Sequence, residues 1–289
     1  MTGIIWGLLA AVFIGVSDAV ARSTTQKVSI SILILAVMSL STVGLSVLFM
    51  FTDDWPRWHG YAWAVSAASG ALNLVALMFL YKAIERGPVA VASPAASSFT
   101  VMLVAMNAFA GQPFSLTQGL AIALVFGGVI MLSRPSKNSV SEPDYDAAWL
   151  RTTALLGLAT AFTVSLRMFF AQEASAELGP MPALYLNRMF ALISVLILVA
   201  LQLQKGQKLN TPKGKMAVLV FAQATLEVAA LWAFLIGSQG DGRIAASIGF
   251  AAFAAITTIT AWLWLGEKVA PKRWFWISVI GLGIILASS

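Results

Sequence analysis

Long apolar stretches separated by short polar or glycine-containing breaks run through the whole chain. A helix needs roughly 20 apolar residues to cross the hydrocarbon core of a bilayer, with about 17 as a lower limit. A β-barrel would instead show segments of about ten residues with alternating polarity, and stretches such as 43–51 and 251–265 do not alternate. The pattern therefore predicts ten membrane-spanning helices, near residues 4–21, 30–51, 62–84, 89–110, 116–132, 150–171, 183–202, 216–236, 244–265 and 272–287.

The same pattern occurs twice. Residues 61–132 align with residues 216–287 at a constant offset of 155 positions without a gap. Glycines coincide as well as apolar runs, with Gly87 on Gly242, Gly111 on Gly266 and Gly128 on Gly283. Coincident glycines are harder to obtain by chance than coincident hydrophobic residues, so the chain is predicted to be an internal duplication.

The duplication divides the chain into two halves of five spans each. We predict a first five-helix repeat over residues 1–133, a linker rich in Ser, Pro and charge over 134–148, and a second repeat over 149–289. Because five is odd, the second repeat enters the membrane in the opposite sense from the first. Inverted repeats with a binding site between them near the midplane are a recurrent plan of secondary transporters. The predicted fold is an all-α integral membrane protein of two inverted repeats.

Composition and charge agree with this class. Hydrophobic residues make up 59% of the chain and charged residues 10%, whereas about 25% of the residues of a soluble domain are charged. The net charge of +6 needs no nucleic-acid partner, because all lysines and arginines except Arg57, Arg167, Arg188 and Arg243 lie in or next to the loops after odd-numbered spans. By the positive-inside rule these loops are cytoplasmic. We expect the lipid partner to be a bacterial inner membrane, with both termini in the periplasm.

The inventory of reactive side chains argues against catalysis. The chain has no cysteine, which excludes disulfides, thiolate metal sites and a cysteine nucleophile. Its one histidine, His59, lies in a loop, and Asp53 and Asp54 have no acidic cluster beside them. An intramembrane hydrolase or transferase would need such a cluster, and an ATP-driven pump would need a Walker motif, which is absent. We therefore expect a transporter with no catalytic residue, metal or cofactor, rather than an intramembrane enzyme.

A longer motif also recurs in both halves. A Gly-rich break, a span with an internal Pro or Gly, a short turn with Gly-Glu and a final Gly-rich span follow one another over residues 87–132 and 242–287. This arrangement resembles the ten-span drug/metabolite transporter superfamily of the EamA-repeat type. The turn Leu265-Gly266-Glu267-Lys268 is similar to that of the family, whereas the first half departs from it with Gly111-Gln112. The resemblance implies a secondary transporter that works by alternating access, which we expect to be monomeric.

Ionisable residues within the spans are candidates for the transport site, because each costs at least about 2.5 kcal/mol in hydrocarbon and normally faces a cavity or a partner. Asp18 and Arg167 lie at nearly corresponding positions of the two halves and would form an ion pair between them. Alternatively, Asp18 would pair with Arg22 one turn further on. Arg188 opens the seventh span and would either reach the substrate or extend its charge to the membrane surface.

Glu227 lies near the middle of the eighth span, with Gln223 one helical turn before it. The same helical face continues to Phe234, as a substrate with a charged head and a ring would require. Glu227 would contact the substrate or take up a proton during transport. The alternative is that a protonated Glu227 is hydrogen bonded to a neighbouring helix and only joins the two helices.

Aromatic and small residues complete the predicted site. Four residues that lie deep in their spans or next to polar positions are candidates for substrate contact: Asn73, Phe79, Tyr81 and Trp232. Small residues and a proline at the starts of the fourth and ninth spans would act as hinges or bring backbone to the substrate. Tight helix packing alone is the alternative. The residues concerned are Pro94, Ser97 and Gly249.

The small-molecule cargo expected from these residues is an amphipathic metabolite. An aromatic or other neutral amino acid presents a carboxylate, an ammonium group and a ring, which an arginine, an acid and several aromatic side chains would meet together. Within the superfamily, bacterial exporters of aromatic amino acids resemble the chain in length, outward termini and number of aromatic residues. Multidrug or quaternary-ammonium cations are the alternative cargo, because Glu227 and aromatic side chains would suit them too.

Overall fold

The computed structural model describes residues 2–25, 27–86, 96, 98–133, 147–265 and 271–288. Within this part of the chain every regular element is a helix. The elements are α1 (Thr2–Thr25), α2 (Ile30–Thr52), α3 (Gly60–Arg86), α5 (Phe99–Phe109), α6 (Leu116–Ser133), α7 (Ala147–Leu178), α8 (Pro180–Gln204), α9 (Lys215–Gly237), the 3-10 turn η1 (Gly240–Gly242), α10 (Arg243–Phe250), α11 (Phe253–Leu265) and α12 (Pro271–Ser288).

Several of these helices are long and apolar enough to cross a bilayer. In the described part of the chain they are Ile30–Thr52, Gly60–Leu80, Arg151–Leu178, Pro180–Gln204 and Lys215–Gly237. Shorter apolar stretches lie in α1, α5, α6 and α12. Large apolar side chains such as Val43, Phe109 and Val218 are exposed on the outer surface, which lipid tolerates because its tails are as apolar as leucine. The chain is thus a membrane-embedded, multi-pass protein.

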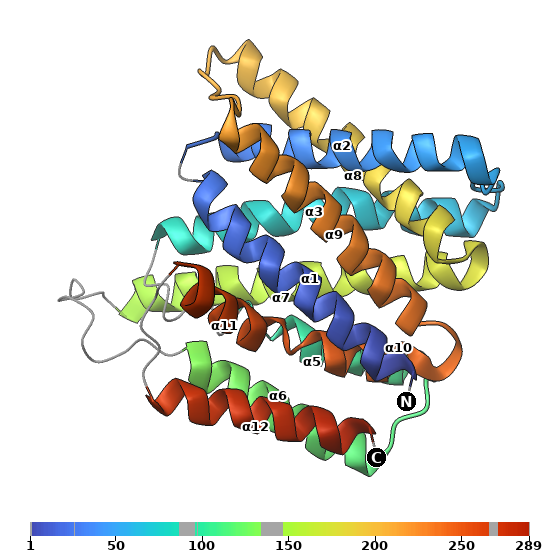
Figure 1. Cartoon of the computed structure of the whole chain (residues 1–289), viewed down its shortest axis with the longest axis vertical. Helices are drawn as coiled ribbons and strands as arrows, with labels where there is room; N and C mark the ends of the chain where they lie inside the picture. The colour runs from blue at the N-terminus through green and yellow to red at the C-terminus, as the bar shows by residue number, and fades with distance from the viewer. Residues whose placement is uncertain are drawn as a thin grey trace.

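Helices from the two halves of the chain alternate in the bundle. α3 packs along α7 and α1 along α9, so each pair joins a helix from the first half to one from the second (Figure 1). α2 lies against α8 and α9, whereas α6 and α12 pack together at the opposite edge. The centre is consequently built by both halves, and Leu103, Leu184 and Phe234 are fully buried there.

Glycines allow the closest helix contacts. Gly7 of α1 lies against the main chain of α10, where an added Cβ would overlap the Ala246 carbonyl group. Gly70 of α3 faces α8, and a Cβ there would lie 2.7 Å from the main-chain nitrogen of Ala191. Helices in lipid gain little from the hydrophobic effect and associate through close packing instead. These two glycines therefore fix the distances at which α1 and α3 meet the second half.

The ninth predicted span, residues 244–265, differs from the prediction because it is not one helix. α10 ends at Phe250 and α11 begins at Phe253, with Ala251 and Ala252 in a turn between them. Gly249 lies against α1, where a Cβ would be 2.5 Å from the Ile4 carbonyl oxygen. The helix is thus interrupted directly after a close backbone contact. The candidate hinges of the first half, Pro94 and Ser97, lie outside the described residues.

Polar contacts, two of which join the two halves, lie near the start of α10 and the ends of α5 and α7. Figure 1 shows these ends on the side of the bundle where α1 begins. Arg243 of α10 forms an ion pair with Glu173 of α7, and the Tyr61 hydroxyl of α3 donates to the same carboxylate at 3.1 Å. A second chain of hydrogen bonds links α5, α7 and the end of α9: Asn107 Nδ2 donates to Gln172 Oε1 at 2.9 Å, and Gln172 Nε2 donates to Ser238 Oγ at 3.0 Å. We call these six residues the end network.

Candidate functional site

A small polar cavity lies where helices of both halves meet. Its volume is about 70 Å³. Its walls come from α1, α3, α7, α8, α9 and α10, and consist of Ile14, Asn73, Arg167, Met168, Arg188, Glu227, Ala230, Leu231 and Phe250. In the described part of the chain, no group of three or more His, Cys, Asp or Glu side chains gathers as a metal site would require.

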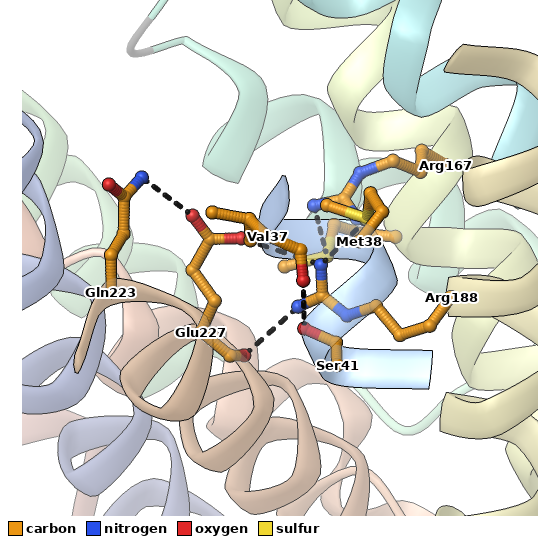
Figure 2. Close-up of polar contacts among 8 residues, drawn as sticks. Val37, Met38, Ser41, Arg167, Arg188, Gln223 and Glu227 are labelled. Atoms are coloured by element: carbon orange, nitrogen blue, oxygen red, sulfur yellow. Dashed lines mark hydrogen bonds and ion pairs between the residues drawn. The ribbon is translucent and has the colours of Figure 1, made fainter. Parts of the chain in front are cut away.

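Glu227 and Arg188 form an ion pair beside this cavity. Arg188 Nη1 lies 3.4 Å from Glu227 Oε2, and Arg188 Nη2 donates to the main-chain oxygen of Glu227 at 3.1 Å. Nη1 also lies 3.4 Å from the thioether sulfur of Met38 in α2. Gln223 Nε2 donates to the other carboxylate oxygen, Oε1, at 3.2 Å. Figure 2 shows Glu227 held between Gln223 on its own helix and Arg188 on α8.

The burial of Arg188 argues against the alternative in which its charge extends to the membrane surface. The residue is 4% exposed, so its charge does not reach the membrane surface and is neutralised by Glu227 instead. An isolated charge at this depth would be costly, and a hydrogen-bonded partner offsets that cost. On α9, residues 223, 227 and 231 follow at intervals of four and share the inward face of the helix.

Arg167 is the second guanidinium group of the cavity. Its Nη2 approaches the Met168 sulfur at 3.5 Å, and a thioether is a weak acceptor. The main chain at Arg167 is fixed more firmly, because Ser69 Oγ of α3 donates to its carbonyl oxygen at 2.8 Å. Asn187 Nδ2 of α8 donates to the same Ser69 hydroxyl at 2.6 Å. The two arginines are thus positioned through one hydrogen-bonded connection between α7, α3 and α8.

The structure pairs the charges differently from one sequence prediction. The charged neighbours of Arg167 are Arg188 and Glu227 rather than Asp18. Asp18 lies in α1 one turn beyond Ile14 and is half-buried. The ion pair at this site lies within the second half, between Arg188 and Glu227, and no ion pair between Asp18 and Arg167 is found among the described residues.

Of the predicted aromatic contacts, the two whose side chains the structure describes, Phe79 and Trp232, do not line the cavity. Asn73 lines the cavity, but Phe79 lies between one and two turns further along α3 and is not part of its wall. Trp232 is 38% exposed, because five residues advance a helix by about 140° beyond a full turn and carry Trp232 away from the face of Glu227. Tyr81 belongs to α3, and its side chain is outside the described residues.

Sequence reasoning missed the aromatic wall of the cavity. Phe250 closes it at the end of α10, directly before the interruption of the helix. Its ring centroid lies 5.3 Å from that of Phe234, and 5.7 Å from that of Phe253, and Phe253 lies 5.8 Å from Phe99. The small residues around Gly249 marked this segment in the sequence, but its orientation depends on the contact with α1. The cavity therefore has a charged side and an aromatic side.

Comparison with known proteins gives the family. The model of the EamA-like transporter family matches residues 1–134 and again residues 151–289. No curated protein matches the chain. A solved structure described as "Crystal structure of protein" superposes with a TM-score of 0.80 at 15% identity, covering 99% of this chain and 96% of that one. At that identity the likeness shows the fold alone. Because the family model matches both halves, the chain belongs to the EamA-like transporter family and is a membrane transporter.

Proposed function

We propose that the protein is a ten-span secondary transporter that exports small amphipathic metabolites, aromatic or other neutral amino acids above all, across the bacterial inner membrane. The observation that carries the proposal is the central cavity, which has guanidinium and carboxylate groups on one side and Phe250 on the other. A zwitterionic amino acid with a ring offers the complementary groups. The similarity to the bacterial aromatic amino-acid exporter YddG in length and aromatic content supports the same cargo class.

Two inverted five-helix repeats, with termini in the periplasm, are the topology that we propose for this function. The family model matches once in each half, and helices from both halves surround the cavity. Interrupted helices at a midplane site recur in secondary transporters, and α10 and α11 form such an interrupted pair next to Phe250. These features support alternating access around one site.

The cavity must widen during such a cycle. Ligand pockets commonly have volumes of about 300 Å³ or more, whereas this one has about 70 Å³. Arg188 and Glu227, both in its wall, join α8 to α9. We propose that the two halves move apart during transport and that the end network separates when the site opens on its side.

Counterflow in proteoliposomes tests the cargo. Vesicles preloaded with unlabelled phenylalanine, tryptophan or threonine are expected to accumulate the labelled form transiently, and protein-free vesicles are not. A quaternary-ammonium cation forms the parallel test, since Glu227 with aromatic rings would suit it. Exchange of the cation without exchange of any of the three amino acids would show that the amino-acid proposal is wrong and that the protein exports cations.

A further inference from the structure

The cavity carries more positive than negative charge. Two guanidinium groups, Arg167 and Arg188, line it together with one carboxylate, Glu227. An arginine keeps its charge in proteins, so the pairing of Arg188 with Glu227 leaves the charge of Arg167 without a carboxylate at this site. Each oxygen of that carboxylate already has a partner, Oε2 in Arg188 and Oε1 in Gln223.

Hydrogen-bond donors are also in excess at the site. A guanidinium has five N–H donors, and the contact that the structure gives the side chain of Arg167 is the thioether sulfur of Met168 at 3.5 Å. Arg188 is 4% exposed, and its Nε is buried without a hydrogen-bond partner among the described residues. Buried donors of this kind favour a ligand that brings acceptor oxygens. A carboxylate is suitable because it can accept two parallel bonds from one guanidinium.

We propose that the substrate is recognised by a carboxylate that pairs with Arg167, and that its ammonium group is dispensable. The inference rests on the proposed transport of small amphipathic metabolites and specifies their chemistry: monoanionic carboxylates with an apolar or aromatic body are also cargo. Ile14, Leu231 and Phe250 supply the apolar wall for that body. Glu227 then acts as a positioning residue that holds Arg188, rather than as the acceptor of the substrate's ammonium group.

Two analogues of phenylalanine distinguish recognition of the carboxylate from recognition of the ammonium group. 3-Phenylpropionate keeps the ring and the carboxylate, whereas phenethylamine keeps the ring and the ammonium group. In competition with labelled phenylalanine counterflow, we expect 3-phenylpropionate to inhibit at concentrations at least roughly tenfold lower than phenethylamine, a difference of about 1.4 kcal/mol in binding. The reverse order would overturn the inference while leaving transport itself demonstrated.

A binding measurement separates this inference from the proposed function. If counterflow of phenylalanine, tryptophan and threonine is absent, the cargo proposal fails. The inference then stands only if 3-phenylpropionate raises the melting temperature of the detergent-purified protein. Sodium chloride at equal ionic strength is the control for salt. Equal stabilisation by chloride would show a site for inorganic anions, and no stabilisation by either compound would show no anion site; both results contradict the inference.

Substitutions assign the effect to the residue. Arg167→Gln is expected to weaken 3-phenylpropionate binding at least roughly tenfold, whereas Arg151→Gln, an exposed position on the same helix, is expected to bind as the parent does. Arg167→Lys keeps the charge but cannot form the bidentate pair of hydrogen bonds that a guanidinium makes with a carboxylate, so intermediate binding is expected. It also provides the comparison if Arg167→Gln does not fold. Unchanged binding in a folded Arg167 variant would contradict the assignment.

Discussion

Glu227 joins α9 to α8 through Arg188, and it supplies the negative charge in the wall of the cavity. Replacing it with Gln keeps the size and a hydrogen-bond acceptor but leaves the buried Arg188 without its counter-charge. Breaking a buried pair from one side typically costs about 3–5 kcal/mol. For Glu227→Gln we therefore expect a clearly lower melting temperature in detergent, measured beside the exposed control Glu177→Gln. An unchanged melting temperature would show that the ion pair contributes little to stability.

The same variant tests whether Glu227 carries a proton. A proton site would make net transport driven by a pH gradient fall in Glu227→Gln while exchange of substrate at equal pH persists. A direct contact with the substrate's ammonium group would make both fall together. We expect exchange to persist, because Arg188 and Gln223 already occupy the carboxylate. Parallel loss in both assays would contradict the positioning role.

The residues of the site were visible in the sequence, whereas their partners were not. Asn73, Arg167, Arg188 and Glu227 could be predicted because polar groups within apolar runs need a reason to be there. That Arg188 pairs with Glu227, 39 positions away, depends on the rotation of α8 against α9, which no local pattern records. Met38 and Met168 approach the arginines through sulfur atoms, and a methionine in an apolar span gives no sign of such a contact.

Among the elements, the long helices follow the apolar pattern closely. The spans expected over 30–51, 183–202 and 216–236 correspond to α2, α8 and α9, each within a few residues at either end. The interruption between α10 and α11 could not be predicted in this way, because a continuous apolar run does not distinguish one helix from two. It follows directly after the contact of Gly249 with α1, a tertiary contact that no local pattern records.

The packing of α1 against α10 is expected to tolerate no side chain at Gly7. A Cβ at this position would overlap the Ala246 carbonyl group, so Gly7→Ala must push the helices apart. Overpacking of this kind costs typically about 1–3 kcal/mol. We expect a lower melting temperature and a lower yield of purified protein.

Gly281 is the matched control for this substitution. It lies in α12 beside open space, and apart from its chain neighbours and the backbone of its own helix no atom would lie within 4 Å of an added Cβ. Gly281→Ala should therefore keep the melting temperature of the parent. If the two variants behave alike, the close approach of α1 and α10 does not limit stability.

For the molecule as a whole, two hydrogen bonds of the end network cross between the halves, from Tyr61 to Glu173 and from Asn107 to Gln172, and these must break if the halves separate on that side. Glu173→Gln removes the charge that Arg243 and Tyr61 share, and Glu177→Gln on the same helix is the control. Because the chain has no cysteine, Ala230→Cys in the cavity wall is a unique thiol. An impermeant maleimide added at the end-network side should label it faster in the Glu173→Gln background, by roughly tenfold for a loss of about 1.4 kcal/mol. Equal labelling in both backgrounds would show that the network does not control access.

The positive charge left on Arg167 has a consequence for the energetics of the membrane. A unit charge that crosses a potential of 100 mV changes in free energy by about 2.3 kcal/mol. In alternating access the site opens first to one side of the membrane and then to the other, so a charge at the site moves through part of the membrane potential. A bound monocarboxylate such as 3-phenylpropionate cancels that charge, so reorientation of the carrier loaded with it should be insensitive to voltage. The unloaded carrier should respond to it. In vesicles clamped with potassium and valinomycin, exchange of 3-phenylpropionate is therefore expected to be independent of the imposed potential, whereas its net efflux varies with it.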